Sequence, residues 1–505
     1  MKAPARLQRV LGWGRWLALP LGSLLALAFA PVDQFLLAFA APAALFVLWQ
    51  DVRPGEAAWR GLLFTMGTFL AGTYWLYHSI HLVGQAPLWI ALFLMLGMVA
   101  IMGAYTAAVG YAMARWAPAR GNLRWLFLLP ALWVLAEWLR GWVLSGFPWL
   151  ALGYTQLATP LRGYAPVLGV YGVSLATAVS AGALAALLLG RTRERTVAVL
   201  VVLAVWGAGA ALNRVQWTTE RGAPLRVALV QGAVPQSMKW EAGQREHTEQ
   251  LYARLMAPYL GHDVIVWPES AIPALEENVR PYLAQMAGLA NDSGSALITG
   301  QLRREATRGA YHNSIAAWAL GQPVQWYDKR RLVPFGEFFP VPQAVREWLR
   351  LMNLPYSDFE PGRADPPPLR AAGETFAPTI CYEDAYGSEQ LALARQSSLL
   401  VNVTNDAWFG DSTAPHQHLD ISRMRSLESG RAMLRASNDG VTALIDYDGS
   451  LLATLPQFQP AVLSGQVQPR TGLTPYLRFG NWPVLAVLWF GVALVVMLYR
   501  RGLRP

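Results

Sequence analysis

Eight long apolar stretches constrain the fold of this 505-residue chain more strongly than any other feature. A helix that spans a bilayer needs about 20 mostly apolar residues. Trp and Tyr are frequent at the ends of these stretches, as is typical of residues at a membrane interface. The sequence therefore predicts a polytopic α-helical membrane domain with about eight spans. The predicted spans are residues 11–29, 32–49, 59–80, 86–114, 124–140, 165–189, 196–213 and 481–499.

The first of these stretches also resembles a secretory signal. Lys2, Arg6 and Arg9 precede its apolar run, and the run ends in Ala-Phe-Ala at Ala30. Because seven further apolar stretches follow, we expect a first helix that is not cleaved.

The charges are distributed unevenly along the chain. Only 14% of the residues are charged, and the formal net charge is +9. Residues 1–213 and 481–505 hold 17 Lys and Arg against 5 Asp and Glu, whereas residues 214–480 hold 24 against 27. The excess of positive charge therefore flanks the apolar stretches and does not form a basic face that could follow a phosphate backbone. We expect no nucleic-acid partner.

The basic residues also predict the orientation of the spans, because loops rich in Lys and Arg stay in the cytoplasm. One set of loops and ends carries 14 Lys and Arg, and the opposite set carries only Arg140 and Arg162. Both termini are therefore expected in the cytoplasm of a bacterium. The chain is expected to divide into a membrane domain of seven helices in the inner membrane (1–213), a periplasmic domain (214–480), and an eighth helix with a cytoplasmic tail (481–505).

Residues 214–480 have a different pattern, in which short β-rich runs alternate with amphipathic stretches. We expect strands that include 376–382 and 399–405, and helices that include 416–436. This alternation predicts an α/β layered domain. The Pro- and Gly-rich run 353–370 is expected to be neither strand nor helix, and a loop of this length is usually a lid or a binding element.

Three apolar runs in this domain end in side chains that can do chemistry. Glu269 lies at the end of the run VIVWPES. Lys329 lies in QWYDKRRLVPFGEF, with Glu337 eight residues later, and Cys381 lies in PTICYED, followed by Glu383. Cys381 is the single cysteine, which excludes an intramolecular disulfide. A carboxylate can accept a thiol proton, and an ammonium can stabilise the oxyanion that forms in acyl transfer. Glu, Lys and Cys therefore form a complete set for acyl transfer.

Each of these residues alone has an ordinary structural explanation, as a solvated cap, a core cysteine or a surface lysine. In this order, however, the three segments resemble the nitrilase (carbon–nitrogen hydrolase) superfamily, in which Glu, Lys and Cys follow one another along the chain and the fold is an αββα sandwich. Such a domain placed before the last span of a polytopic chain resembles the apolipoprotein N-acyltransferase family. The resemblance covers nearly the whole chain and includes LVQGAVPQSMKW (229–240), VIVWPES (264–270), YHNS (311–314), YDKRRLVPFGEFFP (327–340), PYSDFEPG (355–362), ICYED (380–384) and VNVTNDAWFG (401–410).

The resemblance implies roles for individual residues. Glu269 would act as general base, Lys329 as the stabiliser of the oxyanion and the thioester, and Cys381 as the nucleophile. Three residues would support them, namely Glu337, Glu383 and Tyr382. Five residues are expected at the substrate: Trp240, Asn313, Trp408, Phe409, and Tyr356 of the predicted lid. For Asn313, Trp408 and Phe409, strand packing or a structural turn is an equally good explanation.

No metal and no cofactor are expected. None of the seven histidines belongs to an HExxH motif. His416 and His418 are two residues apart, which predicts different sides of a helix and therefore no shared ligand site.

The resemblance also implies the reaction. Cys381 would take an acyl chain from the sn-1 position of a phospholipid, with phosphatidylethanolamine the expected donor, and hold it as a thioester. The α-amino group of an N-terminal diacylglyceryl-cysteine on an apolipoprotein would then accept the chain, in a ping-pong mechanism carried out by a monomer in the lipid bilayer. Two other functions are compatible with the sequence. One is a membrane-tethered amidohydrolase with water as second nucleophile. The other is an inactive scaffold or a transporter, for which Glu137 is the only acidic residue well inside a predicted span.

Reporter fusions test the predicted orientation. Fusions at residues 55, 118 and 193 should read cytoplasmic, and fusions at residues 83, 150 and 300 should read periplasmic, because positively charged loops resist translocation. A cytoplasmic reading at residue 300 would contradict the orientation and also a lipoprotein acceptor, which is matured outside the inner membrane.

Overall fold

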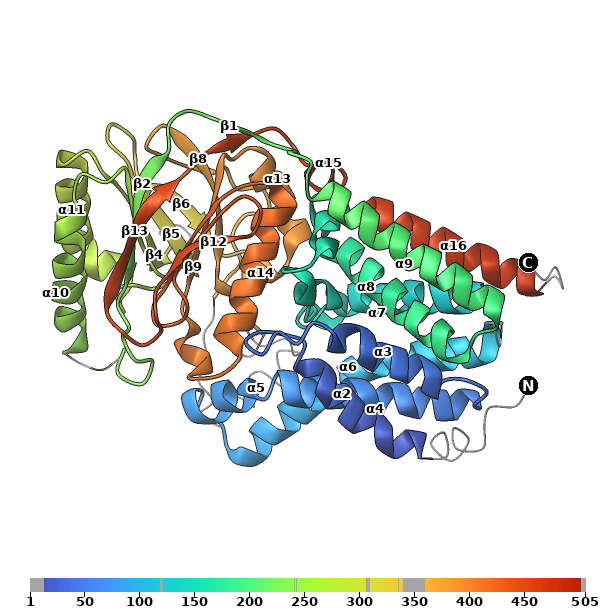
Figure 1. Cartoon of the computed structure of the whole chain (residues 1–505). Helices are drawn as coiled ribbons and strands as arrows, with labels where there is room; N and C mark the ends of the chain where they lie inside the picture. The colour runs from blue at the N-terminus through green and yellow to red at the C-terminus, as the bar shows by residue number, and fades with distance from the viewer. Residues whose placement is uncertain are drawn as a thin grey trace. The chain divides into compact units, whose positions relative to one another are not determined.

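The computed structural model describes residues 13–118, 121–239, 241, 243–305, 309–334, 336–338 and 359–500. Their helices and strands are drawn in Figure 1. The chain forms two compact units. The first unit comprises Met1–Leu76, Leu88–Val215 and Phe479–Pro505, and the second unit comprises Tyr77–Pro87 and Gln216–Arg478. A short piece of the N-terminal half therefore belongs to the second unit.

The first unit is built from helices, and a helix overlaps each of the eight predicted spans. By length and composition, three helices in the described part of the chain are able to cross a membrane: Leu88–Trp116, Pro160–Leu189 and Thr192–Leu212. Two further apolar helices, Leu37–Leu48 and Trp482–Leu498, are shorter. The eight helices are α2 (Gly14–Ala26), α3 (Leu37–Leu48), α4 (Pro54–Gly72), α6 (Leu88–Trp116), α7 (Leu129–Arg140), α8 (Ala165–Leu189), α9 (Thr192–Leu212) and α16 (Trp482–Arg500).

Glu137 in α7 has a structural partner. Its Oε1 accepts a hydrogen bond from the main-chain N–H of Leu152 (3.0 Å), and Arg140, almost one turn later, donates to the carbonyl of Leu150 (2.8 Å). Both side chains are buried. They fasten the segment that follows α7 to the helix, and a buried acid used in this way needs no role in transport.

Two six-stranded sheets form the centre of the second unit. Their strand orders are β13-β2-β3-β4-β5-β6 and β12-β11-β10-β9-β8-β7. The strands β2, β3 and β4 run parallel, as do β8, β9 and β10, and the other neighbours run antiparallel. The bounds are β2 (Leu225–Gln231), β3 (Val264–Trp267), β4 (Ala296–Arg304), β5 (Tyr311–Trp318), β6 (Gln325–Asp328), β7 (Leu369–Ala371), β8 (Glu374–Ile380), β9 (Leu399–Thr404), β10 (Met433–Ser437), β11 (Ala443–Ile445), β12 (Leu451–Thr454) and β13 (Ala461–Val467).

The first of these sheets is buried on both faces. Along β2, Val227 and Leu229 enter an apolar cluster that combines side chains of both sheets, whereas Ala228 and Val230 enter a second cluster. Side chains alternate between the two faces of a strand. The apolar run Val227–Val230 of β2 therefore has packing partners on both faces of the sheet.

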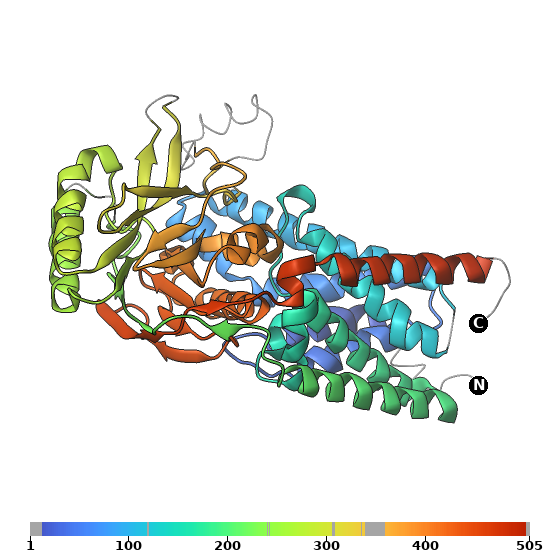
Figure 2. The ribbon, with the colours of Figure 1, turned by 90° about the horizontal axis from the view of Figure 1, so that it is seen from above.

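Helices provide the outer layers of the second unit. The helices α10 (Gln244–Met256) and α11 (Glu276–Asp292) cover the outer face of the first sheet and complete the second cluster. The helices α13 (Gly387–Arg395) and α14 (Ala414–Ser429) lie on the outer face of the other sheet (Figures 1 and 2). The second unit is thus the expected α/β layered domain, with its layers in the order helix, sheet, sheet, helix.

The predicted helix 416–436 is wrong at its C-terminal end. The helix stops at Ser429, because Gly430 has a left-handed φ of +63° and its N–H donates to the Ser426 carbonyl (2.8 Å). The chain then continues as strand β10. Almost every residue of α14 and β10 is buried, so no change of polarity marks the boundary in the sequence.

Two other boundaries also differ from the prediction. Strand 376–382 ends at Ile380, because Cys381 has a φ of +51° and begins the 3₁₀ turn η7 (Cys381–Ala385). The run 353–370 was expected to contain no strand, but its last two residues open β7, which pairs with β8.

Replacing Gly430 by alanine should destabilise the protein. Alanine would have to keep a left-handed backbone conformation, which costs about 1–2 kcal/mol, and its Cβ would lie 2.7 Å from the Thr218 side chain. Thermal unfolding in detergent should show a lower midpoint for Gly430→Ala. Gly288→Ala is the matched control, since Gly288 lies inside α11 with open space around it and alanine favours a helix by roughly 0.5–1 kcal/mol. Equal unfolding midpoints for Gly430→Ala and wild type would contradict this account of the helix end.

Candidate active site

Glu269, Lys329 and Cys381 each follow the end of a strand. Glu269 lies two residues after β3, Lys329 directly follows β6, and Cys381 directly follows β8. The strands β3 and β6 belong to one sheet and β8 to the other, so both sheets contribute to the site. The three side chains are close enough for the charges of Glu269 and Lys329 to act on the Cys381 thiol.

Lys329 is a buried ammonium held by two carboxylates. Its side chain is 1% exposed, and its Nζ lies 2.8 Å from Glu337 Oε1 and 3.6 Å from Glu269 Oε1. Burial alone would favour the neutral amine, but the two carboxylates outweigh it and raise the pKa of Lys329. Lys329 therefore stays positively charged and provides a fixed charge inside the site.

Asn313 and Glu337 hold this arrangement together. The Nδ2 of Asn313 donates to Glu269 Oε1 (2.7 Å) and to Glu337 Oε1 (3.0 Å). The second oxygen of Glu337 accepts a hydrogen bond from the Val333 N–H (2.8 Å). Asn313 thus contacts two of the predicted site residues, and Glu337 connects Lys329 to the segment that follows it.

Glycine at position 300 of β4 makes room for Glu269. A Cβ at this position would lie 2.5 Å from the Cα of Glu269. The Ala271 N–H donates to the Gly300 carbonyl (3.1 Å). This close approach of β4 fixes the direction in which the chain leaves β3.

Cys381 occupies a strained and buried position. Its φ of +51° is unfavourable for a residue with a Cβ. Burial and the negative charge of Glu269 raise the pKa of its thiol, whereas Lys329 and a hydrogen bond with Thr404 partly offset this rise. The resting thiol is therefore neutral at physiological pH, and attack on a carbonyl needs a base that takes its proton.

If residues 381–383 were a strand, Glu383 would lie on the same face as Cys381, but the structure places its side chain elsewhere. Because both residues lie in a 3₁₀ turn, its carboxylate instead accepts main-chain N–H groups of Ile380 (2.8 Å), Arg330 (2.6 Å) and Arg331 (3.1 Å). Burial raises its pKa, and these hydrogen bonds offset part of the rise. Glu383 therefore connects the turn after Lys329 to the residue before Cys381.

The other predicted site residues differ in what the structure says of them. The hydroxyl of Tyr382 accepts a hydrogen bond from Tyr386 (2.8 Å), and its side chain packs against the core between the sheets. Trp240 and Tyr356 lie outside the described residues. The described end of the predicted lid is fastened near the site, because the Gly362 N–H donates to the Lys329 carbonyl (2.8 Å).

Trp408 and Phe409 lie half-buried in the turn η8 (Asp406–Phe409), which follows β9. The hydroxyl of Ser79 donates to the Trp408 carbonyl (2.8 Å). Ser79 belongs to the π-helical segment η1 (His78–Val83), which lies within Tyr77–Pro87, the N-terminal piece of the second unit. A segment far away in the sequence thus contacts the turn that carries both aromatic residues.

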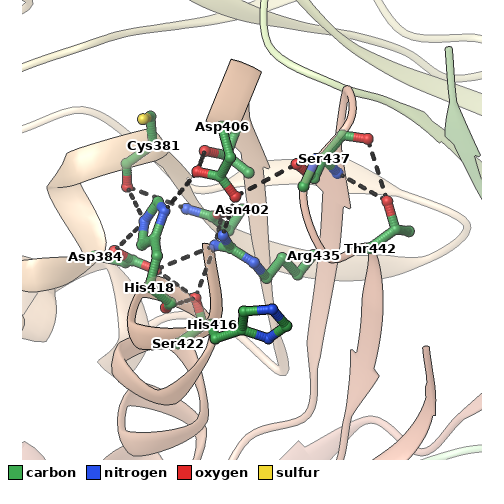
Figure 3. Close-up of polar contacts among 12 residues, drawn as sticks. Cys381, Asp384, Asn402, Asp406, His416, His418, Ser422, Arg435, Ser437 and Thr442 are labelled. Atoms are coloured by element: carbon green, nitrogen blue, oxygen red, sulfur yellow. Dashed lines mark hydrogen bonds and ion pairs between the residues drawn. The ribbon is translucent and has the colours of Figure 1, made fainter. Parts of the chain in front are cut away.

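Sequence reasoning missed several buried polar residues around the site. Lys239 is fully buried, its Nζ donates to the Glu269 carbonyl (3.3 Å), and burial lowers its pKa to about 8. A second group lies beside Cys381, as Figure 3 shows, and consists of Asp384, Asn402, Asp406, His418, Ser422 and Arg435. Two features of the sequence could have indicated these residues. Lysine is rare in this chain, and the apolar run LLVNVT (399–404) contains the polar residues Asn402 and Thr404.

Cys381, Asp406 and His418 bring potential metal ligands within 4.8 Å of one another. His418, however, already bridges Asp406 and Asp384, and Arg435 lies 3.0 Å from the second oxygen of Asp406. A divalent cation would have to bind beside these positive charges, so the donor set fits a cluster of ion pairs better than a metal centre. The absence of a metal stays a prediction.

Comparison with known proteins defines the class of the second unit first. The family model described as carbon-nitrogen hydrolase matches residues 226–476. A second model, described as the apolipoprotein N-acyltransferase N-terminal domain, matches residues 21–183. The chain therefore joins a carbon-nitrogen hydrolase domain to a helical N-terminal domain.

Relatives match over nearly the whole length. An apolipoprotein N-acyltransferase of Azotobacter vinelandii is 43% identical over 501 residues, which cover 96% of this chain and 95% of the relative. Those of Pseudomonas syringae pv. tomato and Chromobacterium violaceum are each 42% identical, over 96% and 95% of this chain and 97% and 93% of their own. The chain belongs to the apolipoprotein N-acyltransferase family. It is an enzyme and, with its apolar helices, a bacterial membrane protein.

Two solved structures are each similar to about half of this chain. A CN-hydrolase superfamily protein from Xanthomonas campestris is 18% identical with a TM-score of 0.37, over 52% of this chain and 97% of its own. An amidase from Nesterenkonia sp. is 21% identical with a TM-score of 0.38, over 53% of this chain and 97% of its own.

Glu383→Ala should abolish turnover while the protein still folds. The substitution leaves three main-chain N–H groups without their acceptor, and an unsatisfied buried donor costs roughly 1–3 kcal/mol. The turns that carry Lys329 and Cys381 then lose their common anchor. For Glu383→Ala, the midpoint of thermal unfolding should be lower than in wild type, and turnover should be lost.

Glu389→Ala is the matched control for this prediction. Glu389 lies six residues later, its side chain is 38% exposed, and its pair with Arg331 (3.7 Å) is of the surface kind that contributes little. Near-normal turnover of well-folded Glu383→Ala would show that Glu383 is not needed by the site.

Proposed function

We propose that this chain transfers an acyl chain from the sn-1 position of a phospholipid, with phosphatidylethanolamine as the expected donor, to the α-amino group of an N-terminal diacylglyceryl-cysteine on an apolipoprotein. One observation carries the proposal. A charged Lys329 and a carboxylate, Glu269, lie beside the single, buried Cys381, in a chain that matches apolipoprotein N-acyltransferases over nearly its whole length.

In the first half-reaction, Glu269 takes the proton of Cys381 while the sulfur attacks the ester carbonyl of the phospholipid. The negative charge that develops on the carbonyl oxygen is stabilised by Lys329, whose ammonium is already held in place by Glu337. When the ester C–O bond breaks, the lysophospholipid alkoxide receives the proton from Glu269. The products are a thioester on Cys381 and a lysophospholipid.

In the second half-reaction, the amine of the lipoprotein attacks the thioester carbonyl. Lys329 stabilises the oxyanion again, Glu269 accepts a proton from the attacking nitrogen, and the C–S bond breaks. The thiolate takes this proton back, and the product carries a new amide. A covalent intermediate allows two dissimilar substrates to use one site in turn.

The remaining assignments belong to the same proposal. Glu337, Glu383 and Tyr382 support the three reacting residues. Asn313, which was expected at the substrate, aligns Glu269 with Glu337, the partner of Lys329. The aromatic residues Trp240, Tyr356, Trp408 and Phe409 would contact the lipid chains and shield the thioester from water.

The membrane arrangement is also part of the proposal. Residues 1–213 contribute seven spans and 481–505 the eighth, with both termini in the cytoplasm and residues 214–480 in the periplasm. The three long apolar helices and the 14-to-2 distribution of basic residues support it. Both substrates keep their acyl chains in lipid, so a monomer with its site at the outer leaflet of the inner membrane can reach both.

Variants of Lys329 test the proposed mechanism. An arginine keeps the charge but places its donors differently, and loss of one well-aimed donor costs roughly 10²–10³ in rate. Lys329→Arg should therefore form the acyl-enzyme far more slowly than wild type, and Lys329→Ala should be slower still. Quenched time courses with phospholipid alone, read as the mass of one added acyl chain on the intact protein, measure these rates.

Variants of Cys381 provide the controls. Cys381→Ala should gain no acyl chain, and Cys381→Ser little or none, because a hydroxyl is a much weaker acid. Wild-type rates for both Lys329 variants would remove Lys329 from the mechanism. Release of free fatty acid or ammonia, without transfer to an amine, would instead support a membrane-tethered amidohydrolase.

A further inference from the structure

Four charged side chains are buried together beneath Cys381, and the proposed mechanism does not use them. Asp384 follows Cys381 in η7, Asp406 begins η8, His418 lies in α14 and Arg435 lies in β10. All four are at most 1% exposed. Charges so deep are retained only when each has a partner.

His418 has a carboxylate on each side of its ring. Its Nδ1 lies 2.9 Å from Asp406 Oδ1, and its Nε2 lies 3.0 Å from Asp384 Oδ1. An ionised carboxylate can only accept hydrogen bonds, so both ring nitrogens donate and the ring is an imidazolium. Burial and the nearby Arg435 favour the neutral ring, but the two carboxylates outweigh them and raise the pKa of His418 to about 9.

Arg435 supplies the second positive charge of the cluster. It donates to Asp406 Oδ2 (3.0 Å), to Asn402 Oδ1 (2.8 Å) and to the Ser422 hydroxyl (2.9 Å). Ser422 donates in turn to Asp384. Two carboxylates and two cations therefore compensate one another, but only while His418 keeps its proton.

The cluster contacts the main chain of the nucleophile. The Nε2 of His418 lies 3.2 Å from the Cys381 carbonyl oxygen, and Asn402 Nδ2 lies 3.5 Å from it. Figure 3 shows this oxygen turned towards His418, with the sulfur on the opposite side of the residue. A residue in a left-handed conformation persists only where its surroundings hold it, and these contacts provide such a hold.

We propose that His418 is a positioning residue for Cys381. Its imidazolium, fixed between Asp384 and Asp406, holds the carbonyl of the strained turn that presents the thiol. Its charge also neutralises the acidic pair beside that thiol. The effect on acyl transfer rests on the function proposed above, whereas the effect on the thiol itself does not.

The electrostatic half of the proposal follows from the position of Asp406, whose carboxylate raises the pKa of the Cys381 thiol. When His418 loses its proton, two carboxylates face one guanidinium, and the excess negative charge disfavours the thiolate further. The folded-state pKa of His418 lies above its usual value of about 6.5. The stabilisation that its ion pairs contribute is therefore complete below about pH 6.5 and is lost as the pH rises through about 9.

Two histidines of α14 give a matched pair of variants for the test. His418→Gln removes the charge and one of the two donors. His416→Gln is the control, because His416 is half-buried and contacts only the Gln457 side chain (3.1 Å) among the hydrogen bonds described. Since Cys381 is the single cysteine, intact mass reports both its alkylation by iodoacetamide and its acylation by phospholipid vesicles.

At pH 7.5, we expect His418→Gln to be alkylated and acylated roughly tenfold to a hundredfold more slowly than wild type, as expected for loss of a charged hydrogen bond. His416→Gln should match wild type. In wild type, alkylation should rise with pH as the thiolate forms, and this rise should weaken above about pH 9, where His418 titrates. His418→Gln should rise without that break, which a role in folding alone would not produce.

Equal alkylation of His418→Gln and wild type, both folded, would overturn the proposal. If His418→Gln does not fold, the wild-type profile decides, and a rise without a break through pH 10 would likewise overturn it. If wild type is alkylated but gains no acyl chain from phospholipid, the proposed function fails. The alkylation rates then still decide the role of His418.

Discussion

Lys329 carries a positive charge into the interior of the second unit, where an isolated charge costs several kcal/mol. Glu337 and Glu269 compensate it, and Asn313 donates to both carboxylates. The loops after β3 and β6 are thereby fixed relative to each other, since each supplies a member of this group. Removal of Lys329 would leave two buried carboxylates without their cation, whereas removal of either carboxylate would leave Lys329 with one ion-pair partner.

Cys381 lies between two such groups. On one side, Glu383 accepts hydrogen bonds from the backbone of the turn that follows Lys329. On the other side, Asp384 and His418 belong to the cluster beneath the Cys381 carbonyl. Within the 3₁₀ turn, the consecutive residues Glu383 and Asp384 have different partners, Glu383 the turn after Lys329 and Asp384 the ring of His418. The unfavourable φ of the nucleophile is thus opposed by contacts on both sides.

The sequence predicted the parts of this site that local patterns determine. Apolar runs ending at Glu269, Lys329 and Cys381 indicated strand ends, and the structure places a strand before each of them. The true end of the last strand, at Ile380, and the real partners of Glu383 were not predictable. They depend on a left-handed backbone at Cys381 and on hydrogen bonds to residues more than fifty positions away.

The charged cluster was missed for a related reason. Asp384, Asp406, His418 and Arg435 lie on four different elements, and in the sequence each resembles an ordinary surface residue. The same burial hid the end of α14, because helix and strand on either side of Gly430 are enclosed by protein. Hydrophobic periodicity reveals a helix or strand that has one solvent-exposed face, and it says little about the ends of an element that is buried on all sides.

The segment Tyr77–Pro87 gives the second unit a boundary that its sequence does not suggest. It is encoded between two helices of the first unit, yet it packs with the hydrolase domain, where Ser79 binds the backbone of Trp408. The hydrolase domain of this enzyme is therefore not one continuous segment of the sequence, because a loop between two helices of the first unit forms part of it. A chimera that exchanges this domain between two members of the family would have to exchange both stretches of the chain. If only the longer stretch were exchanged, Tyr77–Pro87 of one protein would pack against the hydrolase domain of the other.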